Sequence, residues 1–117
     1  FMKIYYARPI SLYNTEQEKR DINTLMRLGF DIVNPNKEEL QNQYKRDGMN
    51  VFLEAIKDCN AIAYRSFPDL KISAGVMKEI QQAIDLGLPV IELPSITSSR
   101  ILSVEDTRAY LMLIGNI

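Results

Sequence analysis

The sequence predicts an α/β protein: a doubly wound, flavodoxin-like parallel sheet of four to five strands with helices on both faces. Two observations predict this class. Short apolar segments alternate along the chain with segments of helical periodicity. The strand segments are apolar throughout, which is typical of parallel strands that are buried on both faces. We therefore expect a single domain over residues 2–117, and we leave Phe1, which precedes Met2, out of the fold prediction.

The chain opens with a strand and a helix. Residues 2–7 (MKIYYA) form a short, largely apolar segment that ends before Pro9. Asn14, with Gln17 three residues on, has the spacing of a capping box and predicts the start of a helix. Gly29 has the residue type expected just after the end of that helix.

The next part of the chain predicts one strand and two helices. Residues 30–34 (FDIVN) read as the second strand, closed by Pro35. Residues 37–46 are polar and predict a short surface helix. Gly48 separates it from residues 50–58, where apolar residues recur with helical spacing.

The last part contains two strands and two helices. Residues 61–65 (AIAYR) and 89–93 (PVIEL) predict the third and fourth strands. Ser73 is a favoured N-cap residue and predicts a helix that runs to about residue 86. Ser103 predicts the start of a final helix that runs to about residue 114.

Glu79 lies at the edge of the apolar stripe of the predicted helix 73–86. Val76, Ile80 and Ile84 lie on the apolar side, so Glu79 is either a solvated border residue or a carboxylate presented to a cleft. Doubly wound sheets bind ligands outside the carboxyl ends of their strands, and the loops expected there are 8–14, 66–73 and 94–103. Glu79 follows the second of these loops, which favours a functional role.

Composition excludes several kinds of site. The net charge is −1, so no basic surface for a nucleic-acid polymer or a membrane is expected. The chain has one cysteine, Cys59, and no histidine, which excludes an internal disulfide, histidine-based catalysis and histidine-based zinc sites. We expect neither a metal nor a cofactor, and we expect a soluble, cytoplasmic protein because no long apolar run or signal-like leader occurs.

Four motifs, in order along the chain, resemble those of the nucleoside 2-deoxyribosyltransferase superfamily. They are Tyr5-Tyr6-Ala7-Arg8-Pro9-Ile10, the segment from Leu28 to Pro35, Ser73-x-Gly75-x-x-x-Glu79 and Gly87-x-Pro89-Val90. The resemblance covers the chain from Lys3 to about Leu93. The serine form of the third motif, with Ser103 downstream, is similar to the nucleoside 5′-monophosphate N-glycosidase branch, the 5-hydroxymethyl-dUMP N-hydrolase-like enzymes.

The resemblance implies a function and a set of site residues. Glu79 would attack C1′ of the sugar, and Tyr5 would help to hold its carboxylate. Ser73, within the motif that includes Gly75, would contact the 5′-phosphate. Ser103 would also serve the phosphate, from the neighbouring subunit of a homodimer. The implied reaction is hydrolysis of the N-glycosidic bond of a nucleoside 5′-monophosphate through a glycosyl-enzyme, without a cofactor.

Two features depart from the family pattern. The family carries an Asp on the helix before the third strand, and the corresponding residue is Phe52. Asp47 and Asp69 are candidate substitutes for this acid. The first loop also lacks the family's Gly-Ser-Ile-Arg sequence, and Arg8 and Ser11 are candidates for the phosphate contact instead.

Alternatives remain at this point. The chain could exchange bases as a deoxyribosyltransferase, or bind nucleotides without catalysis, which Phe52 makes credible. Ser103 could be only a helix cap, and Arg8 only a surface arginine after a strand.

Overall fold

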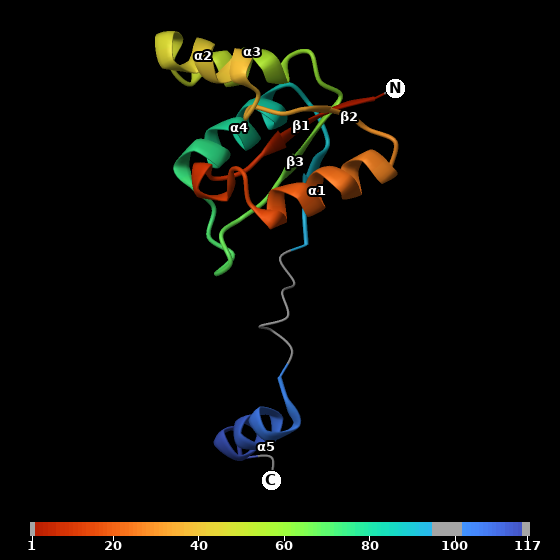
Figure 1. The fold of residues 1–117 in the computed structure, drawn as a ribbon, viewed down its shortest axis with the longest axis vertical. Helices are drawn as coiled ribbons and strands as arrows, with labels where there is room; N and C mark the ends of the chain where they lie inside the picture. Colours follow the sequence, from red (N-terminus) through yellow and green to blue (C-terminus); the bar gives the residue numbers. More distant parts are fainter. Residues whose placement is uncertain (1, 95–101, 116–117) are drawn as a thin grey trace.

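The protein is described by a computed structural model that covers residues 2–94 and 102–115. Within them, four parallel strands form one sheet in the order β2-β1-β3-β4 (Figure 1). The strands are β1 (Lys3–Ala7), β2 (Asp31–Val33), β3 (Ala61–Tyr64) and β4 (Val90–Glu92). This order and the parallel pairing confirm the predicted flavodoxin-like α/β class.

Helices connect the strands and cover both faces of the sheet. The described helices are η1 (Ile10–Leu12, a 3-10 helix), α1 (Glu16–Arg27), α2 (Glu38–Asp47), α3 (Asn50–Ile56), α4 (Ala74–Asp85) and α5 (Val104–Leu113). In Figure 1, α1 lies on one side of the sheet, and α2, α3 and α4 lie on the other.

Two apolar cores result from this arrangement, because successive side chains of a strand point to opposite faces. Tyr6 packs with Ile4 of β1 and Leu25 of α1, whereas Tyr5 packs with residues of α3 and α4. Both tyrosines are fully buried. The two rings therefore lie on opposite faces of the sheet, and both faces are core, as a parallel sheet covered on two sides requires.

The register of the strands brings three loops to one edge of the sheet. Tyr5 pairs with Val33 of β2 and with Ile62 of β3, so the three strands end nearly level. The backbone N–H of Arg65, just after β3, donates to the carbonyl of Ala7 at 3.0 Å. The segments that follow β1 and β3 therefore start side by side.

Helix starts were predicted correctly at two of three caps. Ser73 caps α4 by accepting from the amide of Val76 at 3.3 Å, and Ser103 caps α5 by accepting from the amide of Asp106 at 3.0 Å. The capping box at Asn14 was wrong. Asn14 has a left-handed φ of 61°, and Thr15 is the residue that caps α1, by accepting from the amide of Glu18.

Ile84 belongs to the apolar side of the α4 wheel, yet it is half exposed, because α4 packs on the sheet through Val76, Ile80 and Ala83. Apolar side chains are also exposed on β4, at Val90 and Ile91.

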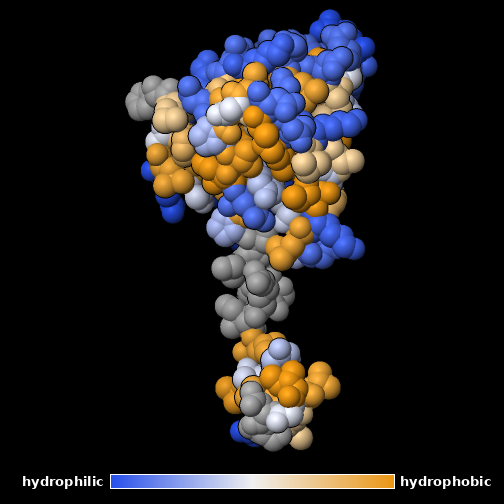
Figure 2. Space-filling view, turned by 180° about the vertical axis from the view of Figure 1, so that it is seen from behind, coloured by the Kyte–Doolittle hydropathy of each residue, from blue (hydrophilic) through white to orange (hydrophobic). Residues whose placement is uncertain are grey.

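The terminal helix α5 has no buried residue and lies apart from the sheet in Figure 1. Its exposed apolar side chains are those of Val104, Tyr110, Met112 and Leu113. Figure 2 shows apolar surface both on the rear face of the globular part and on α5. None of the helices in residues 2–94 and 102–115 has the length and apolar character needed to cross a lipid bilayer.

Candidate active site

A cavity of about 370 Å³ opens beyond the carboxyl ends of β1 and β3. Its walls come from the loop after β1, from α2 and α3, from the loop after β3 and from the first turns of α4. Five of the predicted site residues line it: Arg8, Ser11, Ser73, Gly75 and Glu79. The sheet topology thus places the cavity where doubly wound folds bind their ligands.

Glu79 supplies a carboxylate to this cavity from the second turn of α4. The residue is only 6% exposed, so it is not a solvated border residue. Burial raises the pKa of Glu79 to about 7, although the nearby Tyr5 hydroxyl and Arg8 guanidinium act in the opposite direction. A carboxyl group with this pKa exchanges its proton near neutral pH, which suits a group that takes part in chemistry.

Tyr5, on strand β1, lies next to Glu79. Burial, followed by the negative charge of Glu79, raises the pKa of Tyr5 well above its ordinary value. The Tyr5 hydroxyl makes no hydrogen bond of normal geometry with any described residue. The two groups are therefore close enough to interact electrostatically, and the phenol keeps its proton available to the carboxylate.

The start of α4 forms the polar end of the cavity. Ser73 accepts from the Val76 amide, which leaves its hydroxyl proton free to donate to a ligand. A side chain added at Gly75 would meet no protein atom within 4 Å, so this position faces open space. Free amides, a hydroxyl group and room for a ligand at a helix N-terminus favour an anion.

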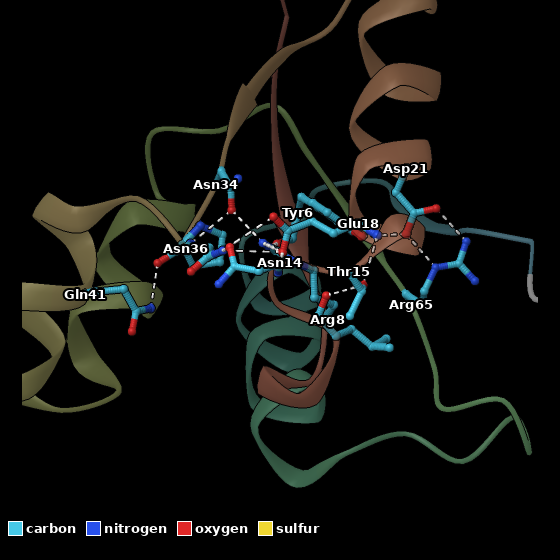
Figure 3. A network of polar contacts seen from close by, with 12 residues as sticks. Tyr6, Arg8, Asn14, Thr15, Glu18, Asp21, Asn34, Asn36, Gln41 and Arg65 are labelled. Carbon is cyan, nitrogen blue, oxygen red and sulfur yellow. Dashed lines mark hydrogen bonds and ion pairs between the residues drawn. The ribbon is translucent and has the colours of Figure 1, made fainter.

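Arg8 lines the cavity but is held by the protein itself. Its Nη2 donates to Glu18 Oε2 at 2.8 Å and to Asn34 Oδ1 at 2.9 Å, and its Nη1 donates to the Tyr6 carbonyl at 3.1 Å. The guanidinium also lies between the rings of Tyr6 and Tyr13, at 4.2 and 4.5 Å from their centroids. Figure 3 shows this network. The surface alternative for Arg8 was wrong, because the side chain is fully buried.

A second buried ion pair lies on the α1 side of the sheet (Figure 3). Asp21 accepts from Arg65 Nε at 2.5 Å and Nη2 at 2.6 Å, and from the Tyr6 hydroxyl at 2.5 Å. These three side chains tie α1 to the ends of β1 and β3. They support the cavity from the opposite face and are not among its lining residues.

Much of the remaining cavity lining is aromatic and apolar. Tyr44 of α2 stacks on Phe52 of α3, with ring centroids 4.9 Å apart and an interplanar angle of 15°. Met49, Phe67 and Tyr13 complete this wall. Sequence reasoning did not select Tyr13, Tyr44 or Met49, since a single aromatic or methionine in a polar segment gives no signal of its own.

Three other predicted candidates lie outside the cavity. Asp69 is in the exposed turn after β3, where it accepts from the amide of Lys71 at 3.0 Å. Asp47 is an exposed residue at the end of α2. Ser103 caps α5 and does not line the cavity of its own chain. Most of the third predicted loop, residues 95–101, lies outside the described residues.

Comparison with known protein families gave no match to a family model, and comparison with curated proteins gave no match either.

Proposed function

We propose that the protein hydrolyses the N-glycosidic bond of a nucleoside or deoxynucleoside 5′-monophosphate, releasing the free base and the sugar 5-phosphate. One observation carries this proposal: a buried carboxylate, Glu79, lines a single cavity together with a helix N-terminus and several aromatic side chains. These three parts match the three parts of a nucleotide, namely the sugar, the phosphate and the base. A nucleotide substrate also agrees with a cytoplasmic location.

Glu79 acts as the nucleophile in this proposal. Its ionised carboxylate attacks C1′ of the sugar, the bond from C1′ to the base breaks, and a glycosyl-enzyme ester forms. Water then attacks C1′ and regenerates the carboxylate. Tyr5 orients Glu79 during both steps, since its hydroxyl is buried beside the carboxylate and has no other partner among the described residues.

The phosphate lies at the start of α4 in this proposal. Ser73 and the adjacent backbone amides donate to it, and Ser11 lines the same cavity from the loop after β1. An Asp at position 73 would repel a phosphate dianion, whereas a serine attracts it. Arg8 lines the same cavity, but its two Nη atoms already bind Glu18, Asn34 and the Tyr6 carbonyl, so the start of α4 is the main phosphate site in this proposal.

A homodimer completes the proposed site. Ser103 is exposed at the start of α5, outside the cavity of its own chain, and α5 carries unburied apolar side chains. Packing of α5 against a second copy would bury this surface and bring Ser103 to the partner's phosphate. Dimers that combine a Ser103→Ala chain with a Glu79→Gln chain test this arrangement, because one of the two sites then has both groups intact.

A non-catalytic nucleotide-binding module is the second candidate. It is favoured by Phe52, which lines the cavity where the family carries an acid. Base exchange instead of hydrolysis would use the same glycosyl-enzyme, with a second base replacing water.

Incubation with a panel of nucleoside monophosphates, followed by chromatography for free base, tests the proposal. Hydrolysis predicts release of base and sugar 5-phosphate in equal amounts from at least one nucleotide. Binding of monophosphates without any base release, either alone or with a second base, would select the non-catalytic module.

A further inference from the structure

The cavity contains one carboxyl group. Among residues 2–94 and 102–115, Glu79 is the single Asp or Glu that lines it, and Asp47 and Asp69 lie outside. The remaining residues, 1, 95–101 and 116–117, include no Asp, Glu or His in the sequence. If Glu79 is the nucleophile, it must be ionised, and it cannot also protonate the departing base in the same step. Within a single chain, the cavity therefore offers no second carboxylic acid for the leaving group.

Tyr13 is a poor replacement for this acid. Burial raises the pKa of Tyr13, and a proton donor works best when its pKa lies near the working pH. A missing general acid lowers the rate by about 10²–10⁴-fold for a base that must be protonated to leave. For a base that leaves without being protonated, the absence of a general acid does not lower the rate.

The aromatic part of the cavity lining also favours one kind of base. Four aromatic side chains line the cavity: Tyr13, Tyr44, Phe52 and Phe67. Aromatic faces attract cations, with an effect of about twofold to thirtyfold on binding. The nearest fixed positive charge, that of Arg8, is paired with Glu18 at 2.8 Å, so it repels a cation only weakly.

We propose, resting on the glycosidase function above, that the preferred substrates are nucleotides whose base carries a fixed positive charge, such as an N7-alkylated purine or a pyridinium. Phe52 and Tyr44 bind the cationic ring, and Phe52 takes the place where an acid would otherwise serve neutral bases. The cavity thus favours a base that can leave without first being protonated.

The bonds balance without a proton donor. A Glu79 carboxylate oxygen forms a bond to C1′, and the electron pair of the bond from C1′ to the ring nitrogen goes to the base. That pair cancels the positive charge, so the base departs neutral. Water then opens the sugar ester, one proton passes to solvent, and the carboxylate is restored.

Two matched pairs of nucleotides test this selectivity: GMP with 7-methyl-GMP, and dGMP with freshly prepared 7-methyl-dGMP. The measurement is kcat/KM for base release, after subtraction of the rate with Glu79→Gln enzyme. The methylated member is expected to react at least about a hundredfold faster than its neutral partner. In Phe52→Asp, which introduces an acid, kcat/KM for the neutral nucleotide is expected to rise at least about tenfold. Phe52→Leu introduces no acid, so it should raise neither rate, and it should lower kcat/KM for the methylated nucleotide about twofold to thirtyfold.

Two results would overturn the inference while the glycosidase function stands. One is a ratio below tenfold in the wild type, and the other is cleavage of neutral nucleotides with no Glu79-dependent cleavage of the methylated ones. Absence of Glu79-dependent cleavage for every nucleotide, neutral or cationic, would instead count against the glycosidase function itself.

Discussion

Arg8 Nη2 lies 2.8 Å from Glu18 Oε2, and both side chains are buried. This contact joins the end of β1 to the first turn of α1 and fixes the loop that forms one wall of the cavity. Glu18 also accepts from the backbone amide of Asn14 at 2.9 Å, so one carboxylate holds both ends of that loop. The Arg8–Glu18 pair therefore holds the wall of the site in place, and Glu18 itself is not a substrate contact.

Glu18→Ala should strongly destabilise the fold, because it leaves the Arg8 guanidinium buried without its counter-charge. We expect a loss of about 3–5 kcal/mol in the free energy of unfolding at pH 7, measured by chemical denaturation. Glu16→Ala is the control, since Glu16 pairs with Lys19 in solvent at 3.4 Å and should cost less than about 1 kcal/mol. Equal effects of the two variants would contradict the structural role of Glu18.

Tyr5→Phe should separate catalysis from stability. The Tyr5 hydroxyl lowers the pKa of Glu79, so its removal should move the acid limb of the activity profile to higher pH. Any loss of stability should be confined to pH values at which Glu79 is ionised, because the hydroxyl favours the carboxylate and has no hydrogen-bond partner of normal geometry among the described residues.

Tyr6→Phe provides the matched control for Tyr5→Phe on the opposite face of the sheet. Its hydroxyl donates to Asp21 at 2.5 Å, so this variant should be less stable by about 1–3 kcal/mol and should leave the acid limb unchanged. The acid limb of the activity profile could instead shift in Tyr6→Phe or stay unshifted in Tyr5→Phe. Either result would show that the Tyr5 hydroxyl has no specific effect on the ionisation of Glu79.

The raised pKa of Glu79 predicts a cost to stability at high pH. The folded state holds the Glu79 proton up to about pH 7, whereas an unfolded chain releases it near its ordinary value. Stability therefore falls as pH rises through this window, by about 3 kcal/mol in total. Glu79→Gln should remove the cost, and so be more stable than wild type at pH 8 and little different at pH 4.5.

Chemical denaturation at the two pH values measures this difference. Glu54→Gln is the control, since Glu54 is an exposed residue of α3 paired with Lys57. If Glu79→Gln raised the free energy of unfolding by the same amount at pH 4.5 and pH 8, the gain in stability would not come from the ionisation of Glu79.

Ser73→Asp tests the phosphate end of the cavity. Asp is as good an N-cap as Ser, so α4 and the stability of the fold should be kept. The added negative charge should weaken binding of nucleoside monophosphates at least about tenfold and leave the matching nucleosides nearly unchanged. Calorimetry with thymidine and its monophosphate measures both affinities. Equal losses for the two ligands would return Ser73 to the role of a helix cap alone.

Much of the fold could be predicted from the sequence, because strand and helix periodicity are local properties. In the described residues, the four strands and five α-helices occur within a few residues of their predicted bounds, including the polar surface helix predicted at 37–46. Glu79 could be placed only at the edge of a stripe, since the pattern does not say what packs beside that edge. It is buried in the folded chain, where Tyr5 of β1 and Arg8 of the following loop lie near it.

The buried charges could not be predicted in the same way. Arg8 follows a strand, and nothing near it in the sequence indicates that Glu18 will neutralise it. Asp21 and Arg65 are 44 positions apart and meet only because α1 packs across β1 and β3. Likewise, the aromatic wall forms from separate elements, with Tyr44 on α2 and Phe52 on α3, and it exists only after the chain has folded.

Base release by wild-type and Glu79→Gln enzyme, measured beside nucleotide binding, tests the central claim most directly. The wild type should release base from at least one nucleoside 5′-monophosphate. Glu79→Gln should reduce that rate by at least about a thousandfold, because the variant keeps the shape of the side chain and loses only the nucleophile. Its affinity for the same nucleotide should stay close to that of the wild type. A Glu79→Gln variant that releases base at the wild-type rate would contradict the account.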